Sequence, residues 1–270
     1  METTGLAKFG RIDETADPDF FVRFLDAACA AASVQAYKRR MLELLELRPG
    51  SRVLDVGCGT GDDVREMAKY VGGDGRVVGI DNSRAMIGVA RQRAEGTEDP
   101  ALFRVADVMD LPFGAASFDS CRADRSLMHV PDARQALAEM ARVTKPGGRI
   151  VVYEVDFETL LIDAADRVLA RKILNTWCDS FRDGWLGRHI PALALDQGLG
   201  DIQIAPYTML LSPPLAHLLM GKATVQRAVA KTVVTAAEGQ RWLEHLEELE
   251  RSGRFFSSLT GFLVAARKAL

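Results

Sequence analysis

The sequence predicts an α/β protein in which helices cover both faces of a mainly parallel β-sheet. From residue 51 onward, short β-branched runs alternate with segments of helical periodicity, which is the pattern of repeated strand–helix units. A glycine-rich loop follows the first of these runs. The length of 270 residues and the 48% hydrophobic fraction allow one large α/β domain with an elaborated cap.

The segment before this alternation is predicted to form two helices. Apolar residues recur at helical spacing through FFVRFLDAACA and again through YKRRMLELLEL, within residues 18–47. Pro49 and Gly50 should end the second helix, because both residues disfavour a continuing helix. We therefore expect residues 1–48 to be an N-terminal helical segment that contributes to the cap.

Strands and helices then follow one another in order. RVLDV reads as a strand, DDVREMAKYV as a helix, RVVGI as a strand and SRAMIGVARQRAE as a helix. LFRVA and FDSCRA are further strands, and a helix is expected over 131–143. The KPGG segment that follows predicts a turn before the strand RIVVYEV.

The C-terminal part is richer in helix. Residues 162–198 are largely helical in pattern and contain two tryptophans, which is typical of a lid or a substrate wall. QIAPYTMLL resumes a strand, 213–253 return to helix, and SLTGFLVAARK is a last strand. We therefore expect 159–270 to form a helical substrate cap together with the final strands.

Charge and composition argue against several functional classes. The formal net charge of -3 does not suit a protein that neutralises many phosphates, so we expect no nucleic-acid partner. The four cysteines are far apart and lack metal-ligand spacing, so we expect reduced thiols and no metal. The sequence contains neither a basic start followed by an apolar run nor an apolar stretch of bilayer length, which predicts a cytoplasmic protein without membrane contact.

The loop after the first strand contains the first candidate binding residues. In open parallel sheets, ligands bind outside the carboxyl ends of the strands, where the sequence VLDVGCGTGDD lies. Gly57, Gly59 and Gly61 permit a tight turn and the close approach of a ligand to the main chain. Asp55 and the two aspartates after Gly61 predict a preference for a cationic ligand over an anionic pyrophosphate. A purely structural turn is the alternative interpretation.

The glycine spacing also disfavours a dinucleotide. The nicotinamide or flavin fingerprint requires a third glycine three residues after the second, and Asp62 occupies that place here. An NAD-dependent oxidoreductase is therefore the less favoured enzyme class.

Two further carboxylates follow the second and third strands. Asp81 comes about twenty residues after the glycines, where a carboxylate can accept both ribose hydroxyls. A helix N-cap is its structural alternative. Asp107 and Val108 stand where a carboxylate can accept the adenine amino group and an apolar side chain can cover the ring, although Asp107 can also be a turn former.

Together these motifs resemble those of the class I S-adenosylmethionine-dependent methyltransferases. VLDVGCGTG, GIDNSRAMI, ADVMDLPFGAASFDS and HVPDARQALAEMARVTKPGGRIVV have the order and spacing of that family over residues 33–156. Within the family, the chain is similar to the ubiquinone/menaquinone-type group of small-molecule methyltransferases. The resemblance implies a Rossmann-like, doubly wound sheet of seven strands with an antiparallel last strand, and a core at 49–158 that binds S-adenosylmethionine and releases S-adenosylhomocysteine.

The resemblance also implies roles for individual residues. The glycine loop corresponds to the methionine site, Asp81 to the ribose site, and Asp107 with Val108 to the adenine site. Arg125 and Ser126 correspond to the border of the methionine end. The candidate cofactor-binding residues are Asp55, Gly57, Cys58, Gly59, Thr60, Asp62, Asp81, Asn82, Met86, Asp107, Val108, Arg125 and Ser126.

Methyl transfer needs mainly alignment, so a dedicated base is optional. Holding the reactants in line contributes on the order of 7–11 kcal/mol of barrier lowering. If the acceptor must lose a proton, His129, after the fourth strand, and His189, in the cap, are candidate bases. Glu154, at the end of the fifth strand, is the third candidate. The structural alternatives are that His129 bonds the turn backbone and that His189 lies on the surface.

The acceptor is expected to be a small molecule. Phe157, Trp177 and Trp185 in the expected wall favour an aromatic or polycyclic specialised metabolite, methylated at C, N or O. A nucleic-acid amino-methyltransferase would place Asn or Asp before Pro-Pro and an aromatic residue after the fourth strand, where this sequence reads ADRS. A non-catalytic S-adenosylmethionine-binding regulatory protein is the alternative from a different class. The extra helices are where a homodimer would form.

Overall fold

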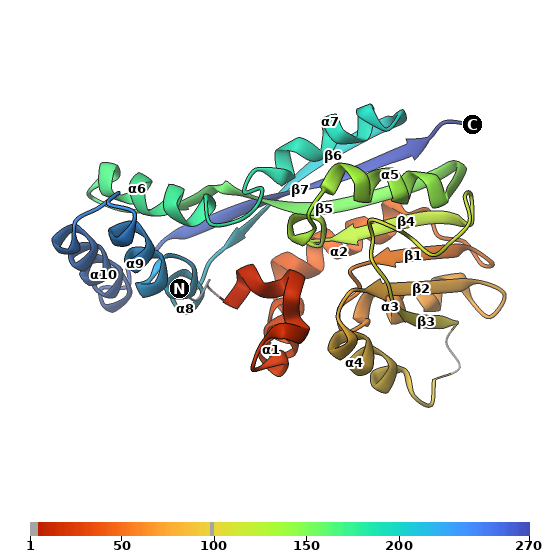
Figure 1. Ribbon diagram of the computed structural model, residues 1–270, viewed down its shortest axis with the longest axis horizontal. Helices are drawn as coiled ribbons and strands as arrows, with labels where there is room; N and C mark the ends of the chain where they lie inside the picture. Colours follow the sequence, from red (N-terminus) through yellow and green to blue (C-terminus); the bar gives the residue numbers. More distant parts are fainter. Residues whose placement is uncertain (1–4, 98–99) are drawn as a thin grey trace.

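Seven strands form one sheet in the computed structural model, which describes residues 5–97 and 100–270 (Figure 1). The strands lie in the order β3-β2-β1-β4-β5-β7-β6. Neighbouring strands pair in parallel, except that β7 is antiparallel to both β5 and β6, which confirms the predicted fold class. The strands are β1 (Arg52–Val56), β2 (Arg76–Asp81), β3 (Ala101–Val105), β4 (Phe118–Asp124), β5 (Thr144–Ile162), β6 (Leu199–Leu210) and β7 (Ser257–Lys268).

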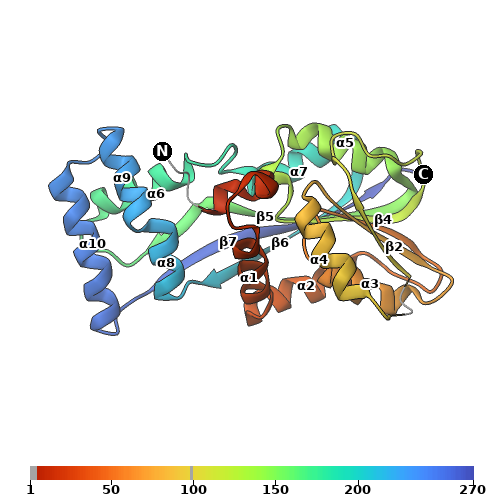
Figure 2. The ribbon, with the colours of Figure 1, turned by 60° about the horizontal axis from the view of Figure 1, so that its bottom comes forward.

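Helices cover both faces of this sheet. The helix α2 packs against β5, β6 and β7 from one side, and α7 packs against the same strands from the other (Figure 2). The helices are η1 (Gly5–Glu14), α1 (Pro18–Cys29), α2 (Ala32–Leu44), α3 (Asp62–Val71), α4 (Arg84–Ala94), η2 (Leu127–His129), α5 (Ala133–Val143), α6 (Arg167–Cys178), α7 (Leu186–Asp196), α8 (Pro213–Met220), α9 (Lys222–Ala230) and α10 (Ala236–Arg251). Within the described ranges, no helix has both the length and the apolar character that a bilayer crossing requires.

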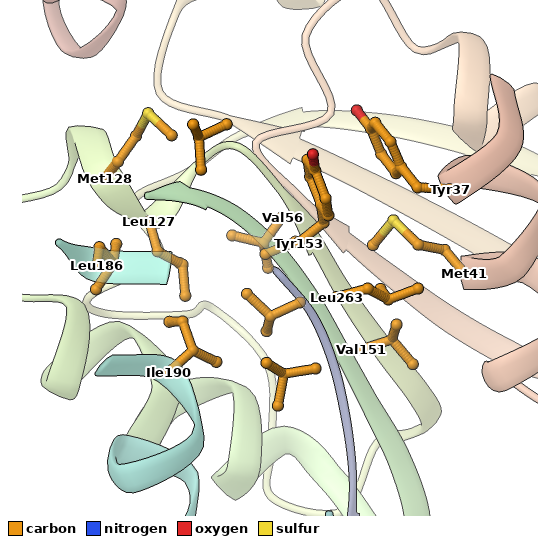
Figure 3. Close-up of a cluster of buried hydrophobic side chains, with 14 of the residues drawn as sticks. Tyr37, Met41, Val56, Leu127, Met128, Val151, Tyr153, Leu186, Ile190 and Leu263 are labelled. Atoms are coloured by element: carbon orange, nitrogen blue, oxygen red, sulfur yellow. The ribbon is translucent and has the colours of Figure 1, made fainter. Parts of the chain in front are cut away.

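Buried side chains on both sides of the central strands make up the core. In Figure 3, Tyr37 and Met41 of α2 lie on one side of the strands, and Leu186 and Ile190 of α7 lie on the other. The ring of Tyr37 stacks on Tyr153 of β5 with centroids 3.8 Å apart. Burial of such side chains stabilises each helix by about 1.5–3 kcal/mol per large apolar residue, which is why amphipathic sequences form helices at these places.

The helical end of the molecule lies beyond the parallel strands. β5, β6 and β7 extend past the other four strands, and α6, α8, α9 and α10 pack against one another around that extension (Figures 1 and 2). A capping box supports α10, because Thr235 accepts a bond from the amide of Glu238, whose carboxylate accepts one from Thr235. The extension places these helices within reach of the binding edge of the sheet.

Both ends of β5 differ from the prediction. The predicted KPGG turn lies inside β5, where Gly147 has a positive φ of +75° and the register with β4 shifts. β5 also continues to Ile162, because its last residues pair with Ser257 and Ser258 of β7. Strand pairing between segments far apart in sequence leaves no local signal, so the sequence could not show this extension.

Candidate cofactor and acceptor site

The carboxyl ends of β1, β2 and β4 face one cavity of about 920 Å³. Small-molecule sites occupy about 300–1,000 Å³, so the volume of this cavity is near the upper end of that range. The structure brings all of the predicted cofactor-binding residues to its wall, although their contacts with a cofactor stay a prediction. They are Asp55, Gly57, Cys58, Gly59, Thr60, Asp62, Asp81, Asn82, Met86, Asp107, Val108, Arg125 and Ser126.

The same cavity continues to the helical end of the molecule, and its wall there is mostly apolar. We call this part the apolar arm. It is formed by β5, the end of α6 with the loop after it, β6, α8 and β7, through Val155, Phe157, Trp177, Ser180, Phe181, Arg182, Met209, Leu210, Leu211, Leu215, Leu219 and Leu259. Two of the predicted wall residues, Phe157 and Trp177, lie in this arm. The third, Trp185, is 44% exposed and lies outside the cavity.

The glycine loop turns so tightly that Gly57 and Gly61 have no room for a side chain. Gly57 and Gly61 have positive φ angles of +69° and +78°. A Cβ atom on Gly57 would lie 2.2 Å from the Oγ of Ser126, and one on Gly61 would lie 2.5 Å from the ring of Phe103. The loop therefore needs glycine for its own fold, and it also leaves the main chain bare toward the cavity.

We expect Gly57→Ala to weaken binding of S-adenosylhomocysteine by at least about tenfold. The added methyl group would displace Ser126, which lines the cavity, and alanine adopts a positive φ only at a cost of about 1–2 kcal/mol. Isothermal titration calorimetry measures the affinity. Gly50→Ala is the matched control, since Gly50 has φ +84° with open space around its Cβ position and therefore incurs the strain without the clash. Equal losses in both variants would contradict the role assigned to the clash.

Asp81, the predicted ribose ligand, connects the loop after β1 to the loop after β2. Its Oδ2 accepts a bond from the amide of Gly59 at 3.0 Å, and its Oδ1 accepts one from the amide of Ser83 at 2.9 Å. Burial raises the pKa of Asp81, although these two amides pull it down. Ser83 is the N-cap of α4, so the alternative that Asp81 caps this helix is wrong.

Asp107 forms a turn and also lines the cavity. One oxygen accepts a bond from the amide of Met109 at 2.9 Å, which is the turn-forming contact of the structural alternative. Asp107 and Val108 nevertheless both line the cavity. The adenine role is therefore compatible with the turn, because a carboxylate has several acceptor positions.

The loop carboxylates already have cationic partners, which the sequence did not predict. Asp62 pairs with Arg65 and lies 3.5 Å from Arg93. Asp55 lies 3.0 Å from a nitrogen of Arg122. The loop therefore presents less uncompensated negative charge to a ligand than its sequence predicts, because these charges are largely neutralised within the protein.

A buried ionic network lies behind the glycine loop. Arg122 of β4 is 3% exposed, and its guanidinium contacts Asp55, Asp63 and Asp124 at 3.0, 2.8 and 3.0 Å. Lys38 of α2 reaches Asp63 at 2.5 Å. Arg122, Asp124 and Lys38 are not among the residues that the sequence predicts for the site. The observed register of β1 with β4 places Arg122 directly beside Asp55, and the sequence alone does not give that register.

Of the three candidate bases, the structure brings only His129 to the cavity wall. Its imidazole stacks on the ring of Phe9 with centroids 5.4 Å apart. Burial and the nearby charge of Arg125 lower the pKa of His129 to about 4, so the ring is neutral at pH 7.

The other two candidates lie elsewhere. His189 is on the outer part of α7, where its side chain is 46% exposed and Nδ1 is 3.1 Å from Asp183, as in the surface alternative. Glu154 is fully buried behind the cavity, and its Oε1 accepts bonds from the amides of Ser126 and Leu127 at 2.9 and 2.6 Å. Burial raises the pKa of Glu154 to about 8. Glu154 thus holds the loop that carries Ser126 in place.

Comparisons with known proteins agree with this geometry. A family model described as a methyltransferase domain matches residues 47–201. An uncharacterized 37.1 kDa protein in transposon TN4556 of Streptomyces fradiae is 39% identical over 96% of this chain and 74% of its own length. The demethylmenaquinone methyltransferase of Bacillus mycoides is 30% identical over 64% of this chain and 80% of its own length. The crystal structure of the YcgJ protein from Bacillus subtilis has the same fold, with a TM-score of 0.60 and 21% identity over 87% of this chain and 99% of that one.

Proposed function

The chain belongs to the class I S-adenosylmethionine-dependent methyltransferases, and we propose that it transfers the cofactor's methyl group to an aromatic or polycyclic specialised metabolite. The observation that supports this proposal is the single cavity that joins the cofactor candidates to the apolar arm. A methyl acceptor in the arm would lie next to a cofactor held by the glycine loop. The acceptor atom, C, N or O, is part of what an assay has to establish.

The residues present suit S-adenosylmethionine. The glycine loop offers bare main chain, Asp81 would accept the ribose hydroxyls, and Asp107 the adenine amino group. When bound, S-adenosylmethionine supplies an electrophilic methyl group on a sulfonium sulfur. Arg125 and Ser126 would border the methionine end.

The N-terminal segment would exclude water from the site. Asp13 of η1 accepts bonds from the Ser83 hydroxyl at 2.5 Å and from the Arg84 amide at 2.8 Å, which ties η1 to the start of α4. Phe9 covers the His129 ring, and Gly10 accepts a bond from the Asn82 side chain at 3.2 Å. Excluding water and aligning the acceptor would provide most of the catalysis, since alignment alone contributes on the order of 7–11 kcal/mol.

We expect His129→Gln to lower kcat by less than the ~10²-fold that a positioned general base contributes. An imidazole with a pKa of about 4 stays neutral from pH 8 down to about pH 5, and it is a weak base. Its replacement should therefore leave the pH profile of methyl transfer unchanged between pH 6 and 8. The profile is measured with the acceptor that the transfer assay below identifies. A larger loss, with a new pH-dependent limb in that range, would show that His129 is a base.

The proposed function is tested in two steps. Calorimetry with S-adenosylmethionine and S-adenosylhomocysteine measures cofactor binding, and absence of affinity for both would contradict the proposal. Transfer from methyl-labelled S-adenosylmethionine to a panel of phenols, hydroquinones and polycyclic hydroxylated compounds, followed by mass spectrometry, measures turnover. Binding of the cofactor without transfer to any compound would support the non-catalytic regulatory alternative instead.

A further inference from the structure

We propose that Ser180 selects an uncharged acceptor by hydrogen bonding its hydroxyl or carbonyl oxygen, while the apolar body of the acceptor packs on Phe157 and Phe181. This inference deepens the proposed function and rests on it. It assigns a specificity-determining residue and narrows the class of acceptor.

The first support is the charge of the apolar arm. Arg182 is its one formally charged side chain among the described residues that line it, and Arg182 is exposed, so its charge stays in contact with water. An ammonium or phosphate group buried deeper in the arm would find no counter-ion. Burying an unpaired charge is strongly unfavourable, so the arm favours an uncharged molecule.

The second support is the packing of three aromatic rings at the wall of the arm. The rings of Phe157 and Phe181 have centroids 3.9 Å apart, and Trp177 meets them edge-on at 4.8 and 5.1 Å. Trp177 is 1% exposed, so this corner is held rigidly. A planar or cyclic apolar body gains both area burial and favourable ring geometry against such a surface.

The third support is an unsatisfied hydroxyl at that corner. The amide of Ser180 donates to the carbonyl of Trp177 at 3.0 Å, which holds the residue directly after α6. Its Oγ is buried and has no hydrogen-bond partner among the described residues. A buried polar atom without a partner is unfavourable, and rotation about the Cα–Cβ bond lets a serine hydroxyl meet a group entering the cavity.

These observations together specify the acceptor's chemistry. An apolar wall with one unsatisfied hydroxyl recognises a mainly apolar molecule with one hydrogen-bonding oxygen. Discrimination of this kind is effective because an analogue without the oxygen leaves the protein's polar group unpaired.

The test uses three ligands with the same ring system. Naphthalene, 1-naphthol and 1-naphthyl phosphate are titrated by saturation-transfer NMR into protein loaded with S-adenosylhomocysteine. We expect the wild-type protein to bind 1-naphthol about fivefold more tightly than naphthalene. Ser180→Ala should bind both equally and keep its melting temperature, since removing an unpaired hydroxyl breaks no bond in the free protein.

Two controls make the result specific. Ser33→Ala, which changes another serine of the cavity wall outside the arm, should keep the preference for 1-naphthol. Phe181→Ala should weaken both neutral ligands alike. Tightest binding of 1-naphthyl phosphate, an unchanged preference in Ser180→Ala, or no binding of any of the three would overturn the inference. Because S-adenosylhomocysteine binding is measured first, failure of the cofactor site is distinguished from failure of the acceptor inference.

Discussion

Replacing Arg122 with methionine is expected to lower the free energy of unfolding by about 3–5 kcal/mol. The guanidinium is the common partner of three carboxylates, Asp55, Asp63 and Asp124, and Asp55 is 2% exposed at its side chain. Methionine fills similar space without supplying charge or donors, so Asp55 would lose the guanidinium that contacts it while still buried. Asp63 would keep Lys38, and Asp124 would keep Lys38 and Arg125. Urea denaturation at pH 7, followed by circular dichroism, measures the loss.

The matched control is an arginine whose ion pair lies at the surface. The side chain of Arg40 is 44% exposed and pairs with Glu43. Arg40→Met should lower the free energy of unfolding by at most about 1 kcal/mol. If Arg122→Met were as mild as Arg40→Met, the buried network would contribute little to stability. Burial raises the pKa of Asp55 to about 7 even beside Arg122, so loss of the cation should raise it further.

Replacing Asp81 with asparagine is expected to weaken binding of S-adenosylhomocysteine by about 100-fold. The substitution keeps the side-chain shape and one carbonyl oxygen, so a bond to the amide of Gly59 or Ser83 can persist. It removes the second acceptor and the negative charge that two ribose hydroxyls would meet. Charge-assisted hydrogen bonds contribute about 1.5–3 kcal/mol each, so the loss should be large.

Calorimetry, combined with a melting curve of the free protein, separates binding from folding in this variant. Asp74→Asn, on the exposed turn before β2, makes the same chemical change away from the cavity and should leave the affinity unchanged. An Asp81→Asn protein that binds within threefold of the wild type would show that this carboxylate serves the loop and not the ribose.

The alternation of strands and helices was readable because local periodicity is strong in this chain. RVLDV, RVVGI and FDSCRA became β1, β2 and β4, and the glycine spacing located the turn after β1. The cofactor candidates met at one cavity because parallel strands deliver their carboxyl ends to the same edge of the sheet. That rule needs only the order of elements, which the sequence contains.

The ion-pair partners of these residues could not be predicted from the sequence. Arg122 approaches Asp63 of α3 from the strand β4, and Lys38 approaches it from α2, 25 positions earlier in the chain. The apparent surplus of acid in the glycine loop therefore disappeared once the fold brought cations to it. Likewise, His129 and His189 looked equivalent as candidate bases until the fold placed one in the cavity wall and the other on the surface.

The fold class, the family and the loop at which a cofactor is expected could be predicted without a structure, because periodicity, glycine spacing and strand-end carboxylates are local properties of the chain. The folded chain was needed to show which charges neutralise one another, which histidine borders the cavity, and that Ser180 lies unsatisfied beside an aromatic corner. Those features depend on distances between segments far apart in sequence, and packing of the whole chain sets such distances.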